Sequence, residues 1–344
     1  MQIKQLGIPN KQAIIILGAG ASRGAKCFED KLNPAPLDAD FFSIMQRVCH
    51  YEPELKQFLD FVRSEFGAGS SPGMEEVFTQ LEALARFSID LKIARGRTVT
   101  RYVIQLKKFV GTIATFFRHT FCDSSGTPLK CDYHETLAEA LNVGDTVISF
   151  NYDCIIDAAL HAKKNKQSWS ASNGYHAKVA SGAAAWDGLG ARGRRARHPI
   201  KLLKLHGSLN WDRATIANEL SLRADPYETL SRSDNEIVPP VWNKTIGGDM
   251  VFSAIWKEAR RMLPKGKIMI VAGYSVPPTD LLTRALIRVS ASEREKSEKL
   301  SHLLVVNPSV EARAKLIDLV RPALDEKSAV IELTSMRKLA ELLS

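Results

Sequence analysis

Short polar segments follow three apolar stretches of this sequence, and their residue types could hold a ligand. These segments are Gly18–Ser22 (GAGAS), Asn151–Asp153 (NYD) and His206–Ser208 (HGS). Small and polar residues at the carboxyl ends of buried parallel strands are how an open α/β sheet builds a nucleotide site, at the point where the strand order reverses. We therefore expect the three segments to meet at one site.

The glycine-rich segment Gly18–Ser22 stands where a strand should turn into a helix. Its backbone N–H groups could point at a pyrophosphate with no Cβ in the way. The G-x-G-x-x-G pattern is not met, because Arg23 stands where the third glycine belongs. Asp38 and Asp40 lie about twenty positions on, where an acidic residue could bind a ribose, but their surroundings indicate a loop entering a helix. The segment is compatible with a dinucleotide, an ordinary dehydrogenase site is disfavoured, and a purely structural tight turn stays an alternative.

Asn151, Asp153 and His206 could carry the chemistry of such a site. Asn151 and Asp153 alternate with Tyr152, so both side chains can face one cleft. An Asn amide can hold a ribose hydroxyl or a water, and His206 could take a proton from either because histidine titrates near neutral pH. The alternatives are that Asn151 or Asp153 caps a helix beginning near Cys154, and that His206 is structural.

Two later polar segments complete the set. Gly273–Ser275 (GYS), with Asp280 beyond it, follows one apolar run, and Asn307 follows another. These residues could hold the second ribose and the adenine of a dinucleotide. Asn-Pro is also a common turn signal, so a structural role for Asn307 is the alternative.

The elements that would position these residues are strands with unalternating apolar sequences, as in parallel sheets covered on both faces by helices. They are expected at 13–17, 145–150, 200–205, 267–272 and 302–306, and a further short strand is expected at 328–333. The stretch 40–142 has helical spacing and is too long for one crossover, so it predicts a helical insertion, whereas 165–199 is predicted to be an irregular loop. We expect one domain over 1–344: a Rossmann-like α/β fold with a parallel sheet, helices on both faces and a small helical subdomain.

Composition sets further limits. The 344 residues are 45% hydrophobic and 25% charged, as in ordinary globular proteins, and no run approaches the roughly 18 apolar residues of a membrane span. With no leader pattern, we expect a cytoplasmic protein without membrane contact. The five cysteines are scattered and form no C-x-x-C pair, which favours reduced thiols over a disulfide frame or a zinc site. They are Cys27, Cys49, Cys122, Cys131 and Cys154.

The formal net charge is +9, and the basic residues are dense only in 192–198 (RGRRARH). A solvated loop is the simplest interpretation of this run. Contact with nucleic acid or with a partner surface is the alternative, because Lys/Arg clusters alone are weak evidence.

Taken in order, the motifs resemble those of the SIR2-like (sirtuin-related) NAD-consuming family, and most of all its bacterial branch in anti-phage defence. The resemblance rests on Gly18–Ser22, Ser149–Asp153, Lys204–Ser208, Gly273–Ser275 with Asp280, and Asn307. It spans about 13–308, nearly the whole chain, and the order of the motifs is more specific than any one of them.

The resemblance implies NAD as the substrate and a role for each matching residue. Gly18, Ala19, Gly20, Ala21 and Ser22 would cradle the phosphates, and Gly273, Ser275 and Asn307 would hold the adenosine half. Asn151 would orient water and the nicotinamide ribose, Asp153 would lie near the carboxamide, and His206 would be the base or a ribose contact. Ser149, Gly207, Tyr274 and Asp280 would also belong to the nucleotide site.

The attacking nucleophile decides the activity within that family. Deacetylating sirtuins usually carry a zinc module with two C-x-x-C pairs after the catalytic histidine, and this chain has no cysteine after Cys154. We therefore expect no metal and an NAD⁺ glycohydrolase that releases nicotinamide and linear or cyclic ADP-ribose. Such an enzyme would exhaust cellular NAD, so we expect it to be held inactive until it is triggered. The trigger would be a partner protein of an abortive-infection system, a nucleotide signal or assembly into an oligomer. A zinc-free deacylase or ADP-ribosyltransferase, and a non-catalytic NAD or ADP-ribose sensor, stay as alternatives.

Overall fold

The computed structural model describes residues 12–29, 31–48, 52–67, 69, 71–90, 98–165, 168–180, 199–213, 219–223, 227, 235–237, 250–277, 280–295 and 298–344.

A six-stranded parallel sheet forms the centre of the described chain. Its strands are β1 (Ala13–Leu17), β2 (Thr146–Ser149), β3 (Lys201–Lys204), β7 (Ile268–Ala272), β8 (His302–Val306) and β9 (Ala329–Leu333). Their order is β3-β2-β1-β7-β8-β9. Each strand lies within one residue of its predicted range. The five strands other than β9 are largely buried, as apolar runs without alternation suit strands covered on both faces, whereas the edge strand β9 is largely exposed. The predicted Rossmann-like α/β fold is confirmed.

The register brings the carboxyl ends of the central strands to one level. Leu17, the last residue of β1, is paired with Ser149 of β2 on one side and with Ala272 of β7 on the other. The polar segments after these strands therefore begin next to one another. The chain continues from β1 to β2 and β3 on one side of β1, and β7, β8 and β9 lie on the other, so the strand order reverses between β1 and β7.

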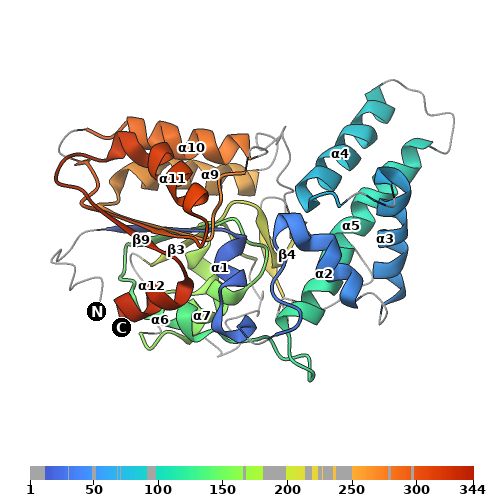
Figure 1. Cartoon of the computed structure of the whole chain (residues 1–344), viewed down its shortest axis with the longest axis horizontal. Coiled ribbons are helices and arrows are strands. Elements are labelled where there is room, and N and C mark those ends of the chain that lie inside the picture. Colours follow the sequence, from blue (N-terminus) through green and yellow to red (C-terminus); the bar gives the residue numbers. More distant parts are fainter. Residues whose placement is uncertain are drawn as a thin grey trace.

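Helices cover both faces of the sheet (Figure 1). One face carries α6 (Asp132–Ala140), α7 (Ile155–Ala162) and α12 (Met336–Leu343), and the other carries α9 (Met250–Met262), α10 (Leu281–Ser292) and α11 (Val310–Val320). Short 3₁₀ turns are η2 (Lys26–Phe28), η6 (Leu263–Lys265) and η8 (Arg321–Ala323). Most of these helices bury one apolar stripe in a core shared with the strands, as amphipathic helices do.

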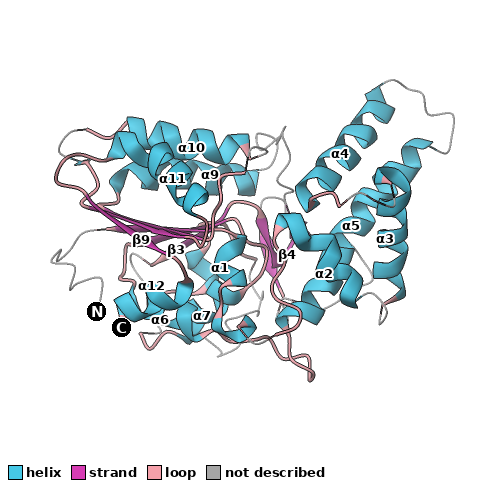
Figure 2. Ribbon diagram, viewed as in Figure 1, coloured by secondary structure: helices cyan, strands magenta, loops and turns pink. Residues whose placement is uncertain are grey.

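The helices of the insertion gather beside the sheet (Figure 2). They are η3 (Asp38–Asp40), α2 (Phe41–Val48), α3 (Pro53–Phe66), α4 (Met74–Asp90) and α5 (Thr98–Phe121). Their core is a second cluster rich in phenylalanine, in which the Phe109 ring lies 4.3 Å from Phe78 and 4.6 Å from Phe58. α6 also lies inside the range expected for the insertion, but its Leu137 and Ala138 pack in the core of the sheet.

A three-stranded sheet, absent from the sequence predictions, follows His206 directly. It consists of β4 (Gly207–Arg213), with β5 (Leu220–Leu222) and β6 (Asn235–Ile237) antiparallel on either side. The short helix α8 (Ala171–Gly174) lies within the stretch expected to be irregular. The basic run 192–198 falls outside the described residues.

Two further expectations concern the membrane and the cysteines. None of the helices in the described ranges has both the length and the apolar character needed to cross a bilayer. Cys27, Cys122, Cys131 and Cys154 are free thiols, and Cys49 lies outside the described residues.

Candidate active site

A cleft of about 780 Å³ opens at the carboxyl ends of the strands, where their order reverses. Ligands of open α/β sheets bind in this position, and the volume is within the usual range for small-molecule sites. Most of the predicted site residues line the cleft: Gly18, Ala19, Gly20, Ser22, Asn151, Asp153, His206, Gly273, Tyr274, Ser275, Asp280 and Asn307. Ala21, Ser149 and Gly207 are not part of its lining.

The residues outside the lining support it from behind. Ala21 and Ser149 are fully buried, and the Ser149 hydroxyl accepts a hydrogen bond from the backbone N–H of Asn151 over 3.2 Å. Gly207 begins β4 with a φ of +81°, a conformation that favours glycine. Their positions indicate roles in shaping the segments rather than in touching a ligand.

The two glycine turns at the reversal point pack backbone against backbone. A Cβ on Gly18 would lie 2.6 Å from the carbonyl oxygen of Gly273, and a Cβ on Gly20 would lie 2.8 Å from the Gly273 Cα. Gly273 itself has a φ of +65°, and its Cβ would lie 1.9 Å from the Ala21 nitrogen. Glycine is therefore required on both sides of the contact by lack of space.

The residues after Gly18 form the short helix α1 (Ala19–Arg23), and the hydrogen bonds of this segment differ from the sequence expectation. The N–H of Gly18 donates to Ala272, that of Gly20 donates to Gly273, and that of Ala21 donates to Gly18, over 2.8 to 3.0 Å. These three N–H groups therefore bond to carbonyls of the protein and are not available to a pyrophosphate. The glycines instead give the turn a fixed shape at the floor of the cleft.

Asn151 carries an unsatisfied acceptor. Its Nδ2 donates to the Gly18 carbonyl over 3.0 Å and to the Ser22 hydroxyl over 2.9 Å. Because a carbonyl can only accept, this partner fixes which end of the amide is nitrogen. Oδ1 is buried and accepts no hydrogen bond from the described residues. A buried acceptor without a donor costs free energy, and such an atom in a cleft is suited to a ligand hydroxyl or a water.

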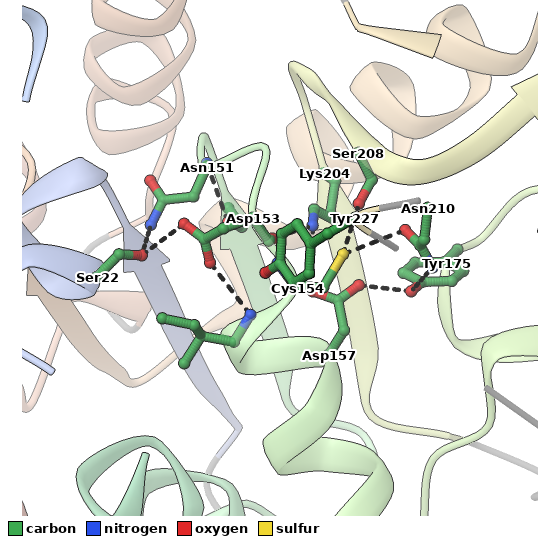
Figure 3. Close-up of polar contacts among 12 residues, drawn as sticks. Ser22, Asn151, Asp153, Cys154, Asp157, Tyr175, Lys204, Ser208, Asn210 and Tyr227 are labelled. Atoms are coloured by element: carbon green, nitrogen blue, oxygen red, sulfur yellow. Dashed lines mark hydrogen bonds and ion pairs between the residues drawn. The ribbon is translucent and has the colours of Figure 1, made fainter. Parts of the chain in front are cut away.

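Asp153 lies on the other side of Ser22 (Figure 3). The Ser22 hydroxyl donates to Asp153 Oδ2 over 2.7 Å, and the backbone N–H of Ile155 donates to Oδ1 over 3.1 Å. The second bond holds the first residue of α7, whose N-cap is Cys154, so Asp153 supports the start of the helix from the position before the cap. Burial raises the pKa of Asp153, while the charge of Lys204 and the Ser22 bond act in the opposite direction.

His206 stands at the turn between β3 and β4 and lines the cleft. Only 5% of its surface is exposed. Its ring is tilted against Phe150, at 5.2 Å between centroids, and against Tyr152, at 6.3 Å. These aromatic side chains hold the imidazole at the edge where the ligand-facing groups gather.

Tyr274, Asp280 and Asn307 also line the cleft. The Tyr274 hydroxyl donates to Asp280 Oδ2 over 3.2 Å, and Asp280 also caps α10. Asn307 Oδ1 accepts the N–H of Ser309 over 2.9 Å, which is the turn role considered as its alternative. Asp280 and Asn307 thus build local structure while they line the cleft.

One wall of the cleft was not anticipated from the sequence, because it comes from the helical insertion. It consists of Asp38, Phe41, Met74, Glu75, Phe117 and Phe121. Asp38, considered above as a ribose contact, accepts the Glu75 N–H over 2.7 Å and so supports the first turn of α4. Burial raises its pKa. The helical spacing of these residues indicates packing, and nothing local in the sequence shows which of them face the cleft.

A buried polar cluster behind Asp153 was also missed. Lys204, in the motif before His206, is 0% exposed and donates to Asp157 Oδ2 over 3.1 Å. Asp157 also accepts from the Tyr175 hydroxyl, which in turn accepts from Asn210 Nδ2 over 3.1 Å (Figure 3). Burial is the largest single influence and opposes the charge of Lys204, but Asp157, Cys154 and Asp153 together outweigh it and raise the lysine pKa. The only available signal was Lys204 itself, one of two lysines that flank the apolar centre of β3.

A metal site needs several ligating side chains close together. Among the described residues, no group of three or more His, Cys, Asp or Glu side chains could hold a metal ion.

Comparisons with known proteins give only distant similarities. No family model matches the sequence, and no curated protein matches it. Among solved structures, a Sir2 homologue in complex with NAD is 12% identical with a TM-score of 0.40, over 97% of this chain and 88% of that one. A Sir2 homologue mutant with 2′-O-acetyl ADP ribose is 15% identical with a TM-score of 0.41, over 100% and 96%. A further Sir2 homologue mutant with ADP ribose is 14% identical with a TM-score of 0.39, over 94% and 96%. Scores at this level do not establish family membership, and the fold assignment rests on the strand order itself.

Proposed function

We propose that the protein is a SIR2-like NAD⁺ glycohydrolase that breaks the bond between nicotinamide and ribose. The observation that carries the proposal is the buried Oδ1 of Asn151, which has no partner among the described residues and lies in a cleft at the reversal point of the sheet. This acceptor matches a ribose hydroxyl or an attacking water, the two groups that the reaction must hold. The motif order along the chain supports the same assignment.

Each part of the cleft then has a task in the reaction. The glycine turns let the backbone approach the diphosphate closely, and Gly273, Ser275 and Asn307 hold the adenosine half. Asn151 orients the nicotinamide ribose and the water, and His206 accepts a proton from one of them. Cleavage develops positive charge on the sugar, so the Asp153 carboxylate favours the transition state when it is ionised.

The insertion wall supports hydrolysis over acyl transfer. Phe41, Met74 and Phe121 bring apolar side chains to the cleft from three different helices. A peptide substrate would need an open groove beside the nicotinamide site, whereas water needs none. This wall therefore favours a small nucleophile.

The cellular role follows from the activity and the resemblance together. An NAD⁺ hydrolase that runs without control would kill its own cell, so we propose an effector of bacterial anti-phage defence that stays inactive until triggered. Control would come from self-association or from a partner protein of the same system. The helical insertion, which lies beside the sheet and contributes to the cleft, is the surface proposed for that contact (Figure 2).

The test is nicotinamide release from NAD⁺, followed by chromatography. Wild type is compared with Asn151→Ala and His206→Ala, and with Asn142→Ala as a matched exposed control. We expect release by wild type and by the control, at a specific activity that rises with protein concentration or with the co-expressed neighbouring proteins, and a loss of at least about 100-fold in both site variants. Release that requires an acylated peptide would identify a deacylase. Tight NAD⁺ binding without release under any condition would identify a sensor.

A further inference from the structure

One peptide group in the candidate active site is held at both ends by buried side chains. The carbonyl oxygen of Asp153 accepts from Lys204 Nζ over 2.6 Å. The N–H of Cys154, the other end of the same peptide unit, donates to the Tyr227 hydroxyl over 3.0 Å. Figure 3 shows Lys204 and Tyr227 beside Asp153 and Cys154.

Fixing both ends of a peptide group fixes the rotation of its plane. That rotation sets ψ of Asp153, and with φ it determines where the Asp153 carboxylate points relative to Ser22. Ser22 in turn accepts from Asn151, whose Oδ1 faces the proposed substrate. The peptide orientation therefore reaches the reacting groups through two side-chain hydrogen bonds.

The two side chains are anchored in different parts of the molecule. Lys204 belongs to β3 and is paired with Asp157 of α7, so its position is fixed relative to the sheet. Tyr227 is attached to the helical insertion: its ring stacks on Phe121 at 5.8 Å and 9°, and its carbonyl accepts from Arg118 Nη1 over 3.1 Å. Both anchors of Tyr227 are on the last turns of α5.

We propose that Lys204 and Tyr227 are positioning residues that clamp the Asp153–Cys154 peptide, and that Tyr227 transmits the position of α5 to the catalytic turn. This inference rests on the proposed function for its kinetic consequence. A displacement of α5, for example on binding of the proposed partner to the insertion, moves Tyr227 and frees one end of the peptide. The insertion thereby controls hydrolysis through the Asp153–Cys154 peptide, in addition to forming one wall of the cleft.

Tyr227→Phe tests the clamp because it removes one hydroxyl and keeps the ring stacked on Phe121. We expect kcat for nicotinamide release to fall at least about tenfold while KM for NAD⁺ changes less than about threefold, since the substrate contacts remain. Tyr175→Phe is the matched control: it also removes a buried tyrosine hydroxyl next to Asp157, but this hydroxyl does not touch the clamped peptide. Its kcat should stay within about threefold of wild type.

A second measurement does not depend on activity. Backbone hydrogen exchange of peptic fragments covering 150–156 should be faster in Tyr227→Phe than in wild type and in Tyr175→Phe, because the Cys154 N–H loses its acceptor. Lys204→Met combined with Asp157→Leu removes the other clamp without leaving a buried charge unpaired, and should speed exchange in the same fragments.

The outcomes separate the two proposals. If wild type neither binds nor hydrolyses NAD⁺, the proposed function fails, and faster exchange in Tyr227→Phe still supports the clamp. Unchanged exchange in Tyr227→Phe overturns the clamp whatever the activity. An equal loss of kcat in Tyr227→Phe and Tyr175→Phe overturns the positioning role, because it would follow from weakening the buried cluster as a whole.

Discussion

The hydroxyl of Ser22 joins Asn151 to Asp153: it accepts from the asparagine amide over 2.9 Å and donates to the carboxylate over 2.7 Å. The three residues come from two segments about 130 positions apart, the helix α1 after β1 and the turn after β2. With its hydroxyl proton committed to Asp153, Ser22 presents only lone pairs to Asn151. The amide is therefore held with Nδ2 toward Ser22 and with Oδ1 on the other side.

Ser22→Ala should break the hydrogen-bonded connection between Asn151 and Asp153. Asn151 loses one of its two orienting bonds, and Asp153 loses a bond that lowers its pKa. We expect nicotinamide release to fall by about 10- to 100-fold and the free energy of unfolding to fall by about 1–3 kcal/mol. Ser64→Ala, which removes a hydroxyl bonded to the Phe61 carbonyl in α3, is the control and should leave release unchanged. Equal release by Ser22→Ala and wild type would contradict the bridge.

Gly273→Ala should disrupt the glycine contact at the floor of the cleft. The added Cβ would lie 1.9 Å from the Ala21 nitrogen, so the turns after β1 and β7 must move apart. We expect a loss of more than about 2 kcal/mol in unfolding free energy, together with loss of NAD⁺ binding by calorimetry. Gly144→Ala is the control for backbone strain without a steric clash, because Gly144 has a φ of +97° and nothing lies within 4 Å of its Cβ position. This control should cost only about 1–2 kcal/mol of backbone strain and should bind NAD⁺ normally.

Asp145 should make the stability depend on pH. Burial raises its pKa to about 6, although it accepts from the N–H groups of Ala13 and Asn142. The folded state binds the Asp145 proton more tightly than the unfolded state, so protonation of Asp145 stabilises the fold at low pH. This contribution to the free energy of unfolding, on the order of 3 kcal/mol, is lost as the pH rises from about 4 to about 6. Urea unfolding between pH 4 and 7 should show this fall in wild type and a flatter profile in Asp145→Asn. An equally steep fall in the variant would assign the effect to other groups.

The buried Lys204–Asp157 pair should show strong coupling in a double-mutant cycle. Both side chains are 0% exposed, so Asp157→Leu alone leaves an ammonium without its counter-ion. We expect this single variant to lose about 3–5 kcal/mol of unfolding free energy. Adding Lys204→Met should restore most of that loss, as measured by urea unfolding. Additive losses in the double variant would show that the two charges do not depend on each other.

The sheet and its carboxyl-end segments could be predicted because they are coded locally. Five of the runs, such as Ala13–Leu17, are followed directly by glycine, asparagine or histidine. In a parallel sheet these segments must meet at one edge, so a cleft followed from the pattern without any knowledge of distances. The hydrogen-bond pattern of Gly18–Ser22 did not follow, because it depends on the close approach of Gly273.

By itself, the sequence determined the strands, the edge at which the polar segments meet and the presence of a helical insertion, since each of these is a periodicity or a residue type within a short window. Only the tertiary structure decided which insertion side chains line the cleft, which atom of Asn151 is left without a partner, and how Lys204 and Tyr227 hold the Asp153–Cys154 peptide. The physical reason is the large separation along the sequence between the residues that meet. Lys204 meets Asp153 across 51 positions and Tyr227 meets Cys154 across 73, and contacts of that kind depend on how cores pack and not on the local sequence.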